Sequence, residues 1–262
     1  GTSVTLISSK AVTATFGVTG NTVVVSHTAA RAAKTATANA GAGASVILSA
    51  RRIENLEALK NEIGSQASCI PLDVTSTESI DNLVKEIRNT SGSLDILVNN
   101  AGVSDPQRFK DLTEESWNYV LETNLNGAFR MAKAVTDIFL EDKKGGSIIN
   151  IASILGIRVG LNLTSYAAAK AGLVQLTKSM ALELARSNIR VNAIAPGYIL
   201  TEINDDFFDT EEGQSYIKSI PMRRLGLESE LDGILLLLAS DASSFMTGSI
   251  IPVDGGHLVN PL

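Results

Sequence analysis

The sequence predicts an α/β fold in which helices cover both faces of a parallel sheet of roughly seven strands. Short apolar runs of strand type alternate with helical segments about seven times, which is the pattern of strand–helix–strand crossovers. The 262 residues, of which 44% are hydrophobic and 19% charged, suffice to bury one large core. Because no repeat or linker interrupts the alternation, we expect a single domain over residues 1–262.

Charge and composition argue against several classes of protein. The net charge of −6 and the isoelectric point near 5.1 disfavour a nucleic-acid partner. The single cysteine, Cys69, cannot form an internal disulfide, so we expect a reducing, cytoplasmic compartment. No run of about 18 apolar residues predicts a membrane span, and no signal peptide is evident. His27 and His257 lie far apart without a cysteine pair, so no metal site is expected.

The first 44 residues depart from what a dinucleotide-binding fold needs. A strand at 22–25 and a helix at 29–40 fit a strand–helix unit in length. In such folds the turn between them is rich in glycine, and the helix N-terminus holds the pyrophosphate. Counting back from the end of the helix near Gly43 places this turn at 26–32, a stretch without glycine. The cofactor contacts expected there are Ser26, Thr28 and Arg31.

Three explanations for this stretch stay open. The turn is divergent and still points backbone amides at a phosphate, with Arg31 supplying charge. Alternatively, the pocket is degenerate and binds cofactor poorly, or the recorded sequence of these residues is wrong. The stretch is a low-complexity run of Ala, Thr and Ser with no acidic residue before Glu54, which favours an error in the recorded sequence.

The second strand, predicted at 45–49, ends without the acidic residue that hydrogen-bonds the ribose 2′-hydroxyl in NAD-binding folds. Ala50 stands in its place, and Arg51 follows. An arginine can bind a phosphate through two parallel hydrogen bonds. The alternative reading of Arg51 is a solvated arginine that opens the next helix. The pattern favours NADP as the cofactor, with NAD as the alternative.

The middle of the chain continues the alternation, with helices predicted at 54–64 and 76–90 and strands at 69–72 and 95–98. Asp73 follows the first of these strands, where it is either a cofactor contact or a turn or N-cap residue. Asn99 to Gly102 follows the second. Asparagine side chains can fix neighbouring strands, and Gly102 allows a ligand to approach closely.

A serine at the end of a strand precedes a Tyr-x-x-x-Lys pair on a helix. The apolar run at 147–152 ends at Ser153, and Tyr166 and Lys170 lie one turn apart in an alanine-rich segment. A nearby ammonium stabilises a tyrosine phenolate, whose pKa is otherwise about 10, and a serine hydroxyl can hydrogen-bond a substrate oxygen. The arrangement suits proton transfer, although the Tyr–Lys spacing alone is common on helix surfaces.

The remaining elements are a helical region at 114–141, a sixth strand at 189–193 that runs to Pro196-Gly197, a last helix at 228–239 and a seventh strand at 249–253. Asn124 lies within the helical region, where an asparagine is unfavourable unless it holds a local kink or a water. Since ligands bind at the carboxyl ends of parallel strands, the residues expected to converge there are Asp73, Gly102, Ser153 and Pro196.

Together these motifs resemble the short-chain dehydrogenase/reductase family. The pieces that match, in order over roughly residue 45 to the end, are Asp73-Val74, Asn99-Asn100-Ala101-Gly102, Asn124-Leu125-Asn126-Gly127, Asn150-Ile151-Ala152-Ser153, Tyr166-Ala167-Ala168-Ala169-Lys170, Pro196-Gly197-Tyr198-Ile199-Leu200-Thr201 and Val253-Asp254-Gly255-Gly256. Each piece alone is weak, but the ordered set is specific. The resemblance implies a doubly wound Rossmann-type domain. It also implies four roles: Tyr166 as catalytic acid/base, Lys170 as its tuner, Ser153 as carbonyl clamp and Asn124 as holder of a proton-relay water.

The resemblance implies further contacts and an assembly. Besides Arg51, the residues expected to bind the cofactor are Asp73, Val74, Asn100, Ala101, Gly102, Ile151, Tyr166, Lys170, Pro196, Gly197, Ile199 and Thr201. The irregular stretch at about 202–226 would form a substrate lid. The helices at 125–141 and 165–186 would pair in a homotetramer.

The sequence therefore predicts an NADP-dependent oxidoreductase that interconverts a ketone and a secondary alcohol by hydride transfer. A sugar acid, polyol or other small carbonyl compound is the preferred substrate, because Ser187 stands where a basic residue would serve an acyl carrier protein. Lys144 and Arg186 keep a 3-oxoacyl-thioester (acyl-carrier-protein) reductase as the alternative. A third reading is a non-catalytic binding protein with a degenerate cofactor loop, which the missing glycines favour and the intact catalytic motifs oppose.

Overall fold

Within residues 22–26, 41, 43–200, 208 and 210–259, which the computed structural model describes, seven parallel strands form one sheet in the order β3-β2-β1-β4-β5-β6-β7. The strands are β1 (Thr22–Ser26), β2 (Ser45–Ala50), β3 (Ala67–Pro71), β4 (Ile96–Asn99), β5 (Gly146–Ile151), β6 (Ile189–Pro196) and β7 (Ile250–Val253). The order reverses between β1 and β4. In doubly wound sheets the carboxyl ends of the strands at such a point form the ligand crevice.

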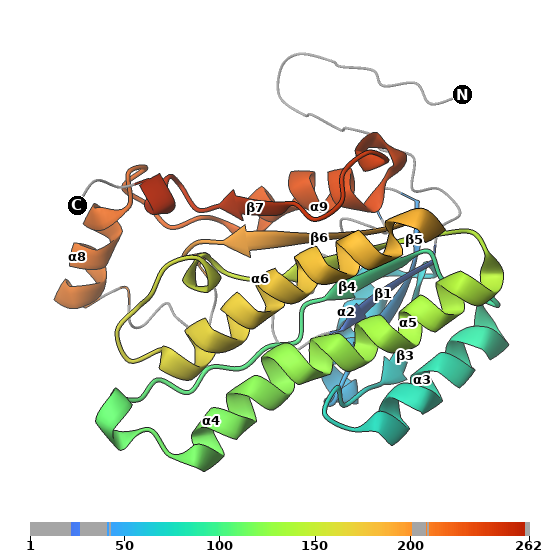
Figure 1. The fold of residues 1–262 in the computed structure, drawn as a ribbon, viewed down its shortest axis with the longest axis horizontal. Helices are drawn as coiled ribbons and strands as arrows, with labels where there is room; N and C mark the ends of the chain where they lie inside the picture. Colours follow the sequence, from blue (N-terminus) through green and yellow to red (C-terminus); the bar gives the residue numbers. More distant parts are fainter. Residues whose placement is uncertain (1–21, 27–40, 42, 201–207, 209, 260–262) are drawn as a thin grey trace.

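Helices pack on both faces of this sheet, because its strands carry apolar side chains on both sides. The helices that cover the sheet are α2 (Ile53–Ile63), α3 (Thr77–Thr90), α5 (Ala128–Asp142), α6 (Thr164–Leu184) and α9 (Asp232–Ala239). Within β5, Ile149 joins the core under α2 and α9, whereas Ile148 joins the core under α3, α5 and α6. Figure 1 shows α3, α5 and α6 side by side in front of the sheet. Burial of both apolar faces stabilises this arrangement, as the α/β prediction expects.

Shorter helical segments connect these elements. The α-helices are α4 (Glu114–Leu121) and α8 (Glu211–Ser219), and a π-helical segment spans Glu122–Gly127 between α4 and α5. Single 3₁₀ turns lie at Phe109–Asp111, Ile154–Gly156, Ala185–Ser187, Glu228–Leu231, Asp241–Ser243 and His257–Val259. Figure 1 shows α8 beyond the carboxyl end of β6.

The sequence places the described elements within a few residues of where the structure has them. One expectation needs correction: α3 is capped by Ser76, whose Oγ accepts the Ser79 N–H at 3.2 Å, so Asp73 is not its N-cap. Asp73 instead holds a turn, because its Oδ1 accepts from the backbone N–H and the hydroxyl of Thr75 at 2.9 and 2.7 Å. The predicted helix at 29–40 lies outside the described residues.

A chain of buried amide and hydroxyl groups ties the sheet to α6. Asn99 Nδ2 donates to Asn150 Oδ1 at 3.0 Å, and Asn150 Nδ2 donates to Thr177 Oγ1 at 2.9 Å. The Thr177 hydroxyl donates in turn to the Leu173 carbonyl at 2.8 Å. Because buried polar groups need hydrogen-bond partners, this chain fixes where α6 lies over β5.

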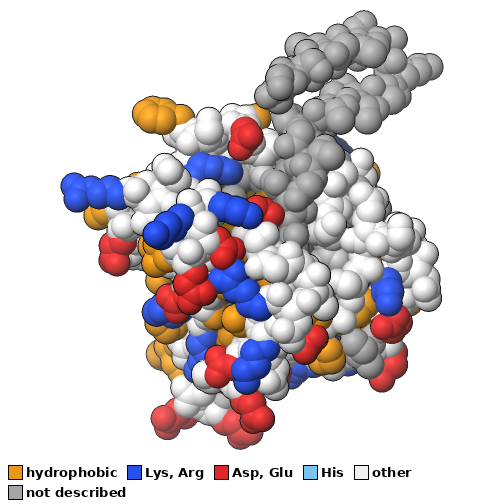
Figure 2. Space-filling view, turned by 90° about the vertical axis from the view of Figure 1, so that its right-hand side faces the viewer, with side chains coloured by type: hydrophobic (Ala, Val, Ile, Leu, Met, Phe, Trp, Pro, Cys, Tyr) orange, Lys and Arg blue, Asp and Glu red, His pale blue; other side chains and the backbone are white. Residues whose placement is uncertain are grey.

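The surface mixes charges of both signs. Figure 2 shows Lys and Arg side chains lying beside Asp and Glu side chains on the described part of one face. Among the described residues, no helix combines the length and the apolar character that crossing a membrane requires.

Candidate active site

Ser153 lies at the turn that ends β5. The strand delivers the chain to the carboxyl edge of the sheet, and a 3₁₀ turn begins directly after Ser153. Its side chain is buried, and its Oγ accepts the Leu155 N–H at 3.1 Å. This bond orients the oxygen and leaves the hydroxyl proton for a ligand, since none of the described residues accepts it.

Tyr166 and Lys170 project from the first turns of α6. The Lys170 Nζ lies 5.6 Å from the centre of the Tyr166 ring, as the four-residue spacing on one helix face requires. Lys170 is only 4% exposed, and its Nζ donates to the Ile151 carbonyl at 2.8 Å. This bond fixes the Nζ beside the Tyr166 ring. An ammonium at such a place stabilises a tyrosine phenolate or a ligand oxygen.

Asn124 lies in the π-helical segment that interrupts the long helix between α4 and α5. Its side chain is 1% exposed; Oδ1 accepts the Val103 N–H at 2.7 Å, and Nδ2 donates to the Val103 carbonyl at 2.8 Å. These two bonds fix the loop that follows β4. The helix is irregular at Asn124, where it becomes π-helical, and π segments inside α-helices frequently mark functional sites.

Gly102 is the point where these elements meet. A Cβ atom added to Gly102 would lie 3.5 Å from Asn124 Oδ1 and 3.7 Å from Lys170 Nζ. A Cβ atom at this position would therefore make ordinary van der Waals contact with both side chains, so the end of β4, the π segment and α6 meet here. Glycine lets a ligand approach the backbone closely at such a point. An amide and an amino group beside a glycine suit the ribose end of a dinucleotide.

The residues predicted to bind the adenine end of the cofactor follow β2 and β3. Arg51 directly follows β2 and is exposed, and its positive charge acts on Asp73. Burial raises the pKa of Asp73, but the hydrogen bonds from Thr75 and the charge of Arg51 outweigh it and hold the pKa below its usual value. The side chain of Val74 is buried against Gly127, where an added Cβ would lie 2.6 Å from Val74 Cγ2, so a ligand would meet the Val74 backbone.

The predicted contacts on the other side of the crevice follow β6. Pro196 ends that strand, and an added Cβ at Gly197 would lie 2.7 Å from the Asp254 Cα, so this turn packs directly against the end of β7. The side chain of Ile199 is 2% exposed and belongs to the core. Asn100 and Ala101 lead from β4 to Gly102, and both are partly buried.

Several predicted contacts fall outside what the structure describes. Of Ser26, only the backbone is described, at the end of β1 beside Asn99. Thr28, Arg31 and Thr201 lie outside the described residues, as does most of the first part of the expected lid, whose later part contains α8. Among the described residues, no three His, Cys, Asp or Glu side chains gather as a metal site would require.

An aromatic cluster next to this site escaped the sequence reasoning. The Tyr198 and Tyr216 hydroxyls are 2.8 Å apart, and the ring centres of Tyr198 and His257 are 5.7 Å apart. The Tyr198 and Tyr166 hydroxyls also interact electrostatically. Burial first, and then the hydrogen bond with Tyr216, raise the pKa of Tyr198 far above its usual value, so its hydroxyl stays protonated. The only sequence signal was the position of Tyr198 directly after Pro196-Gly197.

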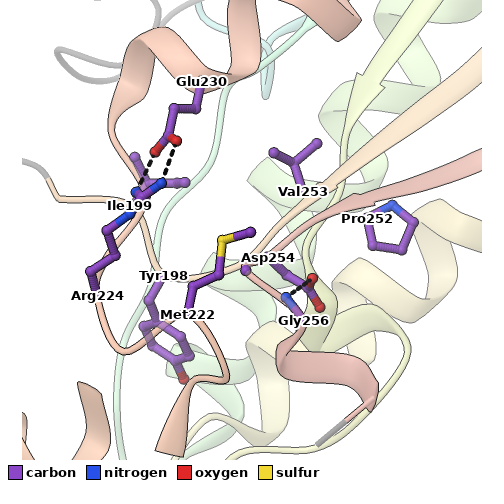
Figure 3. A pocket seen from close by; sticks show the side chains of 11 residues that line it. Tyr198, Ile199, Met222, Arg224, Glu230, Pro252, Val253, Asp254 and Gly256 are labelled. Atoms are coloured by element: carbon purple, nitrogen blue, oxygen red, sulfur yellow. Dashed lines mark hydrogen bonds and ion pairs between the residues drawn. The ribbon is translucent and has the colours of Figure 1, made fainter. Parts of the chain in front are cut away.

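Figure 3 shows the cavity that borders this cluster. It measures about 350 Å³ and lies between the turn at Tyr198, the segment at 222–226 and the end of β7. The polar groups in its wall are already paired. Arg224 and Glu230 form two hydrogen bonds of 2.7 Å, and Asp254 accepts the Gly256 N–H at 2.9 Å.

Comparison with known proteins agrees with this geometry. The family model described as enoyl-(acyl carrier protein) reductase matches residues 27–257. The 3-oxoacyl-[acyl-carrier-protein] reductase FabG of Thermotoga maritima is 36% identical over 220 residues, which are 83% of this chain and 89% of that protein. The chain thus belongs to the short-chain dehydrogenase/reductase family of oxidoreductases.

Solved structures resemble the fold closely. A short-chain type dehydrogenase/reductase from Mycobacterium marinum has a TM-score of 0.86 and 35% identity, and the match covers 92% of this chain and 97% of that one. A gluconate 5-dehydrogenase from Burkholderia cenocepacia, in complex with NADP and tartrate, has a TM-score of 0.87 and 30% identity over 92% of this chain and 96% of that one.

Proposed function

We propose that this protein interconverts a ketone and a secondary alcohol with NADP as cofactor, acting on a small hydroxy acid, polyol or similar compound. The observation that carries this proposal is the convergence of Asn124 and Lys170 at Gly102, with Tyr166 on the same helix face as Lys170. Ser153 stands at the adjoining strand end. A hydroxyl donor, a phenol and a buried ammonium at one point are the groups that proton transfer to a carbonyl oxygen needs.

Each residue has a separate role in this proposal. The Tyr166 hydroxyl gives its proton to the substrate oxygen during reduction and takes it back during oxidation. Ser153 donates a hydrogen bond to the same oxygen. Lys170 stabilises the phenolate that Tyr166 leaves behind and binds the ribose. Asn124 holds the π segment in place, and a water carried by its backbone relays the proton. When bound, the nicotinamide supplies or accepts the hydride.

NADP is proposed over NAD because of the end of β2. Arg51, rather than an acidic residue, follows that strand and is exposed toward solvent, where a 2′-phosphate would lie. The gluconate 5-dehydrogenase relative binds NADP. The remaining cofactor contacts are those expected from the family motifs, including Thr28, Arg31 and Thr201.

Reduction of a 3-oxoacyl thioester is the second candidate, because a FabG protein is a relative over most of the chain. Lys144 and Arg186 do not support it within one chain. Lys144 precedes β5 and Arg186 precedes β6, at the amino ends of these strands, whereas Ser153 lies beyond the carboxyl end. We therefore prefer the small substrate.

We further propose one catalytic domain over residues 1–262, a lid at about 202–226, a homotetramer and a cytoplasmic location. Large apolar side chains lie exposed on α5 and α6, where subunits would pair: Phe129 is 50%, Leu140 44% and Leu182 83% exposed. The single free cysteine, Cys69, fits a reducing compartment.

A substrate panel tests the proposed activity. Oxidation of gluconate and sorbitol with NADP⁺, followed by NADPH fluorescence, is compared with reduction of a 3-oxoacyl thioester by NADPH. Turnover of a small alcohol supports the proposal. Turnover of the thioester alone would establish the second candidate, and a protein that binds no NADPH and turns over nothing is a binding protein on the same scaffold.

A further inference from the structure

The loop after Ser153 carries an arginine that the proposed reaction does not use. The backbone of Arg158 is held near the end of β5, because its N–H donates to the Ile154 carbonyl at 2.9 Å. A bond between residues four apart keeps their Cα atoms about 6 Å from each other. The loop also packs closely against α6, since a Cβ added at Gly156 would lie 2.7 Å from the Lys170 carbonyl oxygen. Arg158 is therefore held in the same corner as Ser153 and Lys170.

The guanidinium of Arg158 is held by a hydrogen bond to a carbonyl, and no carboxylate of the described residues forms an ion pair with it. Its Nη1 donates to the His257 carbonyl at 2.7 Å, which anchors one arm of the group to the last described turn of the chain. The side chain is exposed. A guanidinium has five N–H donors in a planar fork, so one carbonyl leaves most of them for a ligand.

The wall beside Arg158 is aromatic and uncharged near neutral pH. Burial raises the pKa of Tyr198, and the nearby charge of Arg158 only partly opposes this. Burial and then the charge of Arg158 lower the pKa of His257, so its ring stays neutral. The Tyr216 hydroxyl donates a hydrogen bond to the Tyr198 hydroxyl at 2.8 Å.

The acidic side chain beside this aromatic cluster already accepts hydrogen bonds from the backbone. The Asp254 carboxylate, which acts on His257, accepts the N–H groups of Gly256 and Leu258 at 2.9 and 2.7 Å. Glu230 is paired with Arg224 through two hydrogen bonds of 2.7 Å, and Figure 3 shows the Tyr198 ring directed away from this ion pair. An unpaired guanidinium beside neutral rings favours an anionic ligand.

We propose that Arg158 binds the carboxylate of a short hydroxy-acid or keto-acid substrate whose reacting carbon lies at Ser153 and Tyr166. This inference rests on the proposed function and narrows its substrate to an acid rather than a neutral polyol. The Tyr198 hydroxyl interacts electrostatically with both Tyr166 and Arg158, so both groups lie near the same ring. A small molecule bound beside Tyr198 would reach both of them. The two parallel hydrogen bonds of an arginine–carboxylate pair would also fix which carbon faces Tyr166.

Paired probes that differ only in charge test the proposal. Gluconate and its neutral amide, gluconamide, are oxidised with NADP⁺ by the wild type, Arg158→Met, Arg158→Lys and the control Arg186→Met, whose arginine lies at the opposite edge of the sheet. Loss of a hydrogen-bonded charge pair should raise KM for gluconate about 10–100-fold in Arg158→Met, with kcat changed less than about twofold. The kinetics with gluconamide should hardly change in Arg158→Met. In Arg158→Lys, KM for gluconate should lie between the values of the wild type and Arg158→Met.

A binding measurement separates this inference from the proposed function. Tartrate, a small dicarboxylate, is titrated calorimetrically into the NADPH-bound protein, in which the reduced cofactor cannot oxidise it. We expect binding about tenfold or more weaker in Arg158→Met than in the wild type and Arg186→Met, even if gluconate is no substrate. Equal losses for gluconate and gluconamide would overturn the inference. So would tartrate binding that is absent from the wild type or unchanged in Arg158→Met.

Discussion

At the scale of single residues, the proposed catalytic groups Tyr166 and Lys170 could be found from their spacing, whereas the groups that they contact could not. Tyr166 and Lys170 were predictable because four residues make one helical turn. The carbonyl of Ile151, which binds the Lys170 ammonium at 2.8 Å, left no sequence signal, because every residue has a backbone carbonyl. Local spacing reveals pairs on one helix, but contacts between distant segments need the fold.

Arg51 carries the first residue-scale prediction. If it binds the 2′-phosphate, the protein should have a lower dissociation constant for NADPH than for NADH, measured by fluorescence titration. Arg51→Ala should weaken NADPH binding about 10–100-fold and leave NADH binding nearly unchanged. Arg52→Ala is the matched control, because Arg52 is equally exposed one residue further on. Equal wild-type affinities for both nucleotides would remove the argument from Arg51.

The aromatic cluster shows the limit of sequence reasoning at this scale. Tyr198, Tyr216, His257 and Arg158 come from four separate segments that the sheet and its loops bring together. No spacing rule relates them, since their approach depends on the tertiary packing of loops. Only Tyr198 lay inside a recognisable motif.

At the scale of elements, the π segment is the least ordinary feature. The sequence indicated a local irregularity at Asn124, because asparagine disfavours a helix interior, and the structure has a π-helical segment over Glu122–Gly127. The helix type was not predictable, since it depends on the two hydrogen bonds to Val103 on a distant loop. The strands were predictable because buried apolar runs are a strong local signal.

Asn124→Ala tests the importance of this element. The change leaves the partly buried N–H and carbonyl of Val103 without these partners, which should lower the free energy of unfolding by about 1–3 kcal/mol in urea titrations and reduce kcat. Asn126→Ala is the control, because Asn126 is exposed in the same π segment and its loss should change stability by less than about 0.5 kcal/mol. Equal small effects in both variants would mean that the Val103 contacts do not hold the segment.

At the scale of the whole molecule, the assembly remains to be measured. The exposed apolar side chains Phe129 and Leu140 on α5 and Leu182 on α6 would be buried if these helices pair between subunits. We expect light scattering to give a homotetramer, or failing that a dimer. Leu182→Glu should shift the equilibrium toward smaller species. A wild-type mass near the 27.6 kDa of one chain at micromolar concentration would contradict this expectation.

The seven-stranded sheet explains how the site is assembled from the whole chain. Its carboxyl edge brings together the ends of β4, β5 and β6, which lie far apart in sequence. The overall fold was predictable because the alternation of strands and helices allows few topologies. The turn at 26–32 lies largely outside the described residues, so its three explanations remain predictions to be tested by the gene sequence.

The central claim is that Tyr166 transfers the proton, and the pH dependence of alcohol oxidation tests it most directly. Rates for the wild type and Tyr166→Phe are measured across the pH range at saturating NADP⁺, with NADPH binding as the check on folding. The Phe ring keeps the packing and removes only the hydroxyl, so kcat should fall about 10²–10⁴-fold and the wild-type ionisation should vanish from the profile, while NADPH still binds. An unchanged rate and profile in Tyr166→Phe would mean that the proton comes from another group and that the assignment is wrong.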